Sequence, residues 1–72
     1  MEYPNLIMTE LRGPSLFSMS IIAYWPYNRE MTIKMIQDQY RDNPTLVEQQ
    51  LGKRNMKMLR DALLLTDKPT LS

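Results

Sequence analysis

The chain contains neither cysteine nor histidine among its 72 residues, and this limits the ways in which so short a chain can become stable. A core of this size typically supplies only about 3–5 kcal/mol, so small natural domains often add a disulfide, a metal ion or a partner. A disulfide requires cysteine, and zinc and copper usually bind histidine or cysteine. We therefore expect one small domain over residues 1–72, without a metal or cofactor, that depends on close helix packing, on a protein partner or on a homo-oligomer.

The overall composition is that of a folded domain with little net charge. Hydrophobic residues make up 43% and charged residues 24% of the chain, and nine basic residues against eight acidic ones leave a net charge of +1. Dedicated nucleic-acid binders are usually more basic, although a local patch can suffice. The longest apolar-rich run, residues 16–25, is about half of the roughly 20 residues that a membrane-spanning helix needs. We expect a soluble chain, intracellular or peripheral to an assembly.

The N-terminal third predicts a short β-hairpin-like or extended segment. Alternate positions within residues 15–25 are apolar, and β-branched and aromatic residues are frequent there, which favours a strand. The alternating residues are Phe17, Met19, Ile21, Ala23 and Trp25. A helix capped by Ser15 is an alternative, because the same segment also matches a helical pattern.

Two or three helices are predicted to follow, so the expected fold class is mainly α. Asn28 is a plausible N-cap for a helix over residues 28–41, and Thr45 with Glu48 matches a capping box for a helix over residues 45–51. A further helix is expected over residues 55–65. Gly52 either breaks the last two helices apart or is tolerated within one continuous helix at a cost of about 1 kcal/mol. Residues 1–4 and 67–72 are predicted to be flexible ends.

The main functional hypothesis is a non-catalytic protein-binding module, either an accessory subunit of a larger assembly or a small regulator or inhibitor. Apolar residues near one stripe of a continuous helix, together with an aromatic cluster, would meet the partner, since methionine and large aromatic residues suit adaptable interfaces. The basic residues after Gly52 would form the rim. The predicted interface residues are Trp25, Tyr27, Val47, Leu51, Met56, Met58 and Leu65.

The alternative is a DNA-binding regulator of the helix-turn-helix type using residues 44–64. Such a motif joins two helices by a short turn and places the second helix in the major groove. The pattern fits at Val47, Leu51, Gly52 and Met58 but not at Glu48, Lys53 and Asp61. The predicted nucleic-acid contacts are Lys53, Arg54, Asn55, Lys57 and Arg60. Such a run of basic residues is more often a solvated helix face balanced by nearby acids.

Enzymatic activity is not expected. Without histidine or cysteine, acid–base catalysis would have to use aspartate, glutamate, lysine or tyrosine. The acidic residues are scattered, and the two glycines lie too far apart to form a phosphate-binding loop. The sequence therefore predicts no catalytic residues.

Overall fold

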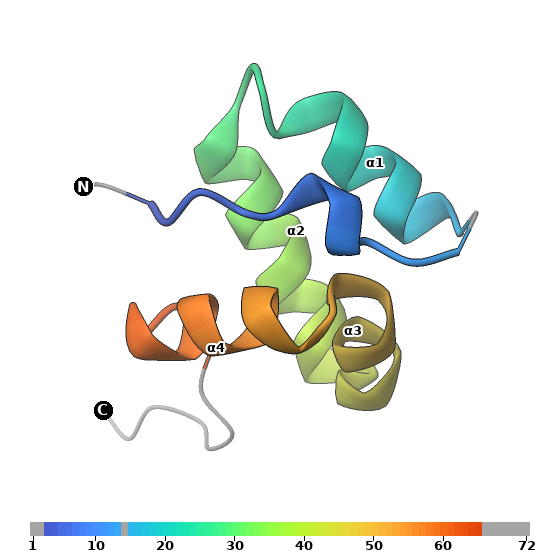
Figure 1. Ribbon diagram of the computed structural model, residues 1–72, viewed down its shortest axis with the longest axis vertical. Helices are drawn as coiled ribbons and strands as arrows, with labels where there is room; N and C mark the ends of the chain where they lie inside the picture. The colour runs from blue at the N-terminus through green and yellow to red at the C-terminus, as the bar shows by residue number, and fades with distance from the viewer. Residues whose placement is uncertain (1–2, 14, 66–72) are drawn as a thin grey trace.

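The structure is a computed structural model that describes residues 3–13 and 15–65, and this part of the chain is mainly helical, as predicted (Figure 1). It contains a short 3-10 turn and four α-helices. These elements are η1 (Met8–Glu10), α1 (Leu16–Tyr24), α2 (Arg29–Asp42), α3 (Pro44–Leu51) and α4 (Lys53–Asp61). The predicted strand and hairpin are not found within the described ranges, so the N-terminal third differs from the expectation.

Helix α1 occupies the segment for which a strand was favoured. Its N-cap is Ser15, whose side-chain oxygen accepts a hydrogen bond from the backbone N–H of Ser18 at 3.1 Å. Of the alternating apolar residues, Phe17, Ile21 and Trp25 are buried, and their spacing of four residues places them on one face of a helix. Because this segment is apolar on every side, the period-two pattern gave no real discrimination between strand and helix.

Helices α2 and α3 begin at asparagine caps. The side chain of Asn28 accepts a hydrogen bond from the backbone N–H of Met31, as expected for the predicted cap. The side chain of Asn43 caps α3 through the N–H of Leu46, and Pro44 follows in the first turn. The capping box expected at Thr45 is therefore wrong, and α3 starts one residue earlier, at Pro44. Proline suits the first position of a helix because the N–H that it lacks would have no partner within the helix there.

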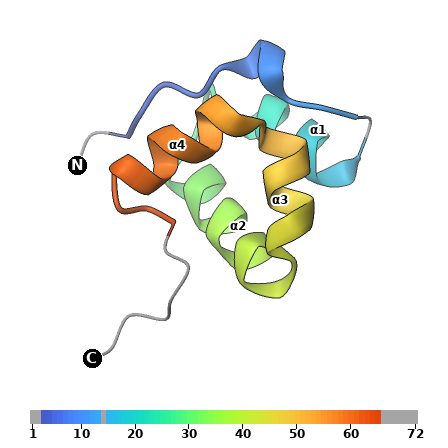
Figure 2. The same cartoon turned by 60° about the horizontal axis from the view of Figure 1, so that its bottom comes forward.

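Gly52 breaks the chain into two helices, which excludes the continuous helix. Its backbone has φ +91° and ψ 160°, a combination that essentially only glycine adopts. A Cβ atom at this position would lie 3.1 Å from the carbonyl oxygen of Glu10. Figure 2 shows α3 and α4 leaving this corner in clearly different directions.

The N-terminal segment, residues 3–13, lies across the helices and closes the core (Figure 1). Leu6 is buried in that core, and Tyr3 packs against it. The flexible ends were predicted over residues 1–4 and 67–72. Of these, only Tyr3 and Pro4 fall within the described ranges, and both are half-buried. The core is one cluster of buried hydrophobic residues. It contains Leu6 of the N-terminal segment, residues of all four α-helices, and Trp25 and Leu65, which follow α1 and α4. No described helix has the length and apolar character needed to cross a membrane.

Candidate functional site

Most of the predicted interface residues belong to the core. Trp25, Val47, Leu51, Met56 and Leu65 are all buried, each with at most 5% of its surface exposed. Met58 is half-buried, whereas Tyr27 is 89% exposed. The apolar stripe that the sequence suggested for a partner is thus used to hold the four helices together, and only Tyr27 stands fully in solvent.

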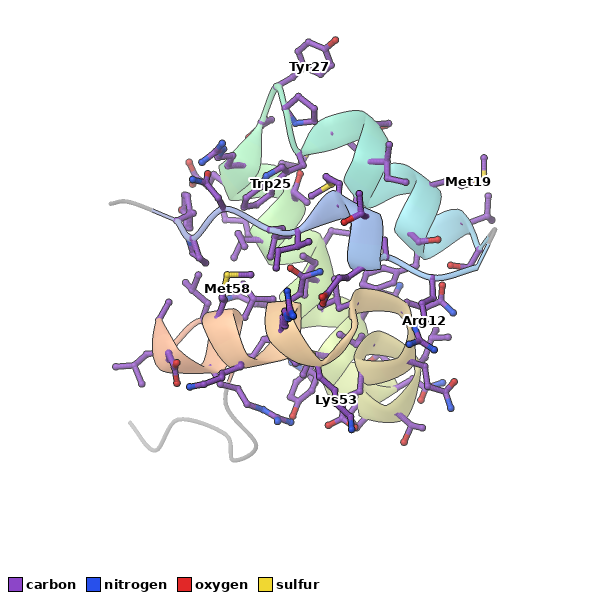
Figure 3. All side chains as sticks on the ribbon, in the orientation of Figure 1. Arg12, Met19, Trp25, Tyr27, Lys53 and Met58 are labelled. Atoms are coloured by element: carbon purple, nitrogen blue, oxygen red, sulfur yellow. The ribbon has the colours of Figure 1, made fainter. Side chains whose placement is uncertain are left out.

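Five of the seven large exposed apolar side chains among the described residues lie on α1 or just after it, and the other two are Met31 and Leu63. We name the surface on the outer side of α1 the outer α1 face. Leu16 is 83% exposed, and Met19 and Ile22 are each more than half exposed. Figure 3 shows Met19 and Tyr27 projecting away from the body of the molecule. The face consists of Leu16, Met19, Ile22, Ala23, Tyr24 and Tyr27.

This face has no charged residue within it, because none occurs between Arg12 and Arg29 in the sequence. A surface helix ordinarily carries polar and charged side chains opposite its buried stripe, and a helix that is apolar all round is usually covered on all sides. Helix α1 buries Phe17, Ser18 and Ile21, but none of the described residues covers its other side. The absence of charge over residues 13–28 was the sequence signal that could have located this surface.

At the end of α1, an arginine covers one side of the buried tryptophan. The guanidinium of Arg29 lies over the ring of Trp25, 4.9 Å from its centroid. This is a favourable position for a cation beside the negative face of an aromatic ring. Trp25 is therefore held between the core and Arg29, whereas its neighbours Tyr24 and Tyr27 are exposed to solvent.

The basic residues lie on the exposed side of α4, and three of them have acidic partners. Arg54 pairs with Glu10, Lys57 with Asp61, and Arg60 with Glu48 at 2.8 Å. The hydrogen bond with Asp61, and secondly its negative charge, raise the pKa of Lys57. The described residues supply no acidic partner for Lys53 or Arg12, and both line an open groove beside η1 and the α3–α4 corner (Figure 3).

Asn55, predicted to contact nucleic acid, lies fully inside the protein. Its side-chain oxygen accepts a hydrogen bond from the N–H of Ile7 at 2.7 Å, and its side-chain nitrogen donates to the carbonyl oxygens of Ile7 and Leu51. With 0% of its surface exposed, Asn55 holds the N-terminal segment against α4. Burial of a polar side chain requires such partners, and here they come from the backbone.

The described residues include no cluster of side chains suited to metal binding. No group of three acidic, histidine or cysteine side chains within the described ranges is placed to hold a metal ion. The acidic side chains with described contacts form surface ion pairs instead. The geometry thus draws attention to two surfaces, the outer α1 face and the basic side of α4.

Comparison with known proteins identifies no relative of this chain. No protein-family model matches the chain, and no curated protein or solved structure matches it.

Proposed function

We propose that the chain is a non-catalytic protein-binding module, acting as an accessory subunit or small regulator, and that the outer α1 face meets its protein partner. The single observation that carries this proposal is a charge-free helix with one apolar side left uncovered. Scattered exposed apolar residues are common on proteins and need no explanation. Here Leu16, Met19, Ile22 and Tyr24 lie along α1, and Tyr27 follows just beyond its end. Clusters of exposed apolar residues are typical of surfaces that take part in association.

Of the predicted contact residues, Tyr27 remains in the proposed contact surface, while the others give way to residues of α1; the predicted mechanism is unchanged. Burial of methionine, isoleucine, leucine and tyrosine side chains against a partner would remove apolar surface from water, which is the main driving force in most protein association. The flexible side chain of Met19 can adjust to the partner's shape. The basic residues lie on α4 and not on α1, so they are not part of the proposed contact surface.

Site-specific photo-crosslinking in the cells that make this protein tests the proposal. The photoreactive residue p-benzoylphenylalanine would replace Met19, and in a matched control it would replace Asp42, which is exposed at the end of α2. We expect irradiation to join the Met19 variant to a discrete protein, while the Asp42 variant gives background only. A correctly folded Met19 variant that yields no more adduct than the control would refute the proposed surface.

A DNA-binding regulator using residues 44–64 is the second candidate, and the break at Gly52 favours it. However, one residue joins α3 to α4, whereas helix-turn-helix motifs use a turn of three or four residues. With Asn55 buried, contacts to DNA would rest on Lys53, Arg54, Lys57 and Arg60.

Retention on immobilised duplex DNA across a salt series tests this candidate. Binding through phosphates weakens steeply as salt rises. We expect a double variant, Lys53→Ala with Lys57→Ala, to lose retention if α4 binds DNA. Failure of the unmodified chain to bind even at low salt would remove the candidate.

A further inference from the structure

We propose that the protein that covers the outer α1 face is a second copy of this chain, so that two α1 helices pack antiparallel across a two-fold axis. This inference rests on the proposed function, because it names the partner of the same surface. Three properties of the face support a self-association: its charge, its area and its distribution of large and small side chains.

The absence of charge suits contact between identical surfaces. In a two-fold interface each residue faces the same patch of the partner, so a charged residue near the axis would meet its own like charge. No such residue exists between Arg12 and Arg29. The hydroxyl groups of Tyr24 and Tyr27 can remain in contact with water at the rim. Two copies of this face can therefore approach without burying an unpaired charge.

The exposed area is close to what a specific dimer needs. The five large side chains of the face are between 45% and 89% exposed. At roughly 200 Å² for a fully exposed tyrosine side chain, and less for leucine, methionine and isoleucine, they present roughly 500 Å². Ala23 and its exposed neighbour Pro26 enlarge this area. A specific interface of standard size buries about 800 Å² on each partner. The face is therefore of the right order for a dimer of moderate affinity.

Two small residues on this side of α1 would allow close approach of the two helices. Ala23 belongs to the face, and the half-buried Ser20 lies beside it. Both share one side of the helix with Leu16, since residues three and four positions apart are neighbours on a helix, and Tyr27 follows beyond the helix end. In an antiparallel pair, the small residues of the two copies would meet near the axis. Leu16 of each copy would then approach Tyr27 of the other, so that large side chains pack at both ends.

The oligomeric state of the full chain, measured by sedimentation equilibrium over a range of concentrations, tests this inference. We expect the unmodified chain to pass from monomer to dimer. Ala23→Glu should weaken dimerisation at least tenfold, because it brings two negative charges together near the axis. Ala23→Lys should do the same with positive charges. As a control, Gln49→Glu on the exposed side of α3 should dimerise like the unmodified chain.

Mixing the two charged variants provides the decisive comparison. If residue 23 of one copy lies near residue 23 of the other, the Glu and Lys variants should associate with each other more tightly than either associates with itself. Circular dichroism and the fluorescence of Trp25 would establish that each variant is folded. Equal dimerisation of the Ala23→Glu variant and the Gln49→Glu control would overturn the proposed interface.

The crosslinking experiment separates this inference from the proposed function. An adduct of the Met19 variant with twice the mass of the chain supports the second copy. An adduct with a different protein, together with a chain that stays monomeric in sedimentation, overturns the dimer and retains the protein-binding function. A monomeric chain without any specific adduct overturns both.

Discussion

Replacement of Asn55 by alanine should remove the main polar attachment of the N-terminal segment. Asn55 makes three hydrogen bonds, two with the backbone of Ile7 and one with the carbonyl oxygen of Leu51. Alanine would remove all three and leave the N–H and C=O groups of Ile7 without these partners. It would also open a small cavity at a fully buried position.

The expected cost follows from the number of bonds. A hydrogen bond typically contributes about 1 kcal/mol to stability, and a buried group left without a partner costs about 1–3 kcal/mol. We therefore expect Asn55→Ala to lower the free energy of unfolding by about 3 kcal/mol. Since a domain of this size has only about 3–5 kcal/mol in total, the variant should lie close to the limit of folding.

Urea unfolding followed by tryptophan fluorescence measures this loss. Trp25 is the only tryptophan and is buried, so its emission reports the state of the core. The control is Arg54→Ala, which removes an exposed ion pair with Glu10 from the neighbouring position; exposed pairs contribute about 0–1 kcal/mol. If both variants unfold at the same urea concentration with the same slope, the buried hydrogen bonds of Asn55 do not contribute the stability expected from them.

Two further predictions concern Gly52 and Lys57. Gly52→Ala should lower the free energy of unfolding by about 2–3 kcal/mol because alanine is strained at this backbone conformation, and because its Cβ would press on the carbonyl of Glu10. In urea unfolding it should cost more than Gly13→Ala, whose Cβ would meet the side chain of Gln50; a smaller cost would contradict this account of the corner. Asp61→Ala should lower the pKa of Lys57 measured by NMR titration, since the Asp61 hydrogen bond and charge raise that pKa. Stability from this pair is present below the ordinary lysine pKa and is lost as pH rises through the raised value, so the two proteins should differ least at strongly alkaline pH; an unchanged pKa would show that the pair does not form.

The sequence predicted those features that depend on neighbouring residues. The cap at Asn28 is a local signal, and the predicted helix over residues 28–41 agrees closely with α2, Arg29–Asp42. The interruption at Gly52 was one of two alternatives that the sequence left open. Choosing between them required the backbone of Glu10, which approaches Gly52 only in the folded chain.

Features that depend on residues distant in the sequence could not be predicted from the sequence alone. Asn55 lies between Arg54 and Lys57 in the sequence, a context typical of a solvent-exposed residue, but its partner Ile7 is 48 positions away. Likewise, Val47 and Leu51 have the spacing of either an interface or a core, and only the packing of α2 and α3 assigns them to the core. For α1, the sequence has apolar residues on every side of the helix, so the pattern of apolar and polar residues could not distinguish a helix from a strand.

The attachment of Ile7 to Asn55 also has a consequence for synthesis on the ribosome. Chains emerge from their N-terminus, so residues 3–13 leave the ribosome well before α4, which carries their attachment point, has been made. During that interval Leu6 has no completed site in which to be buried. Helices α1 and α2 can pair early, but the core closes only after nearly the whole described chain has emerged, and a chain stalled before Asn55 would display its N-terminal segment to the quality-control machinery of the cell.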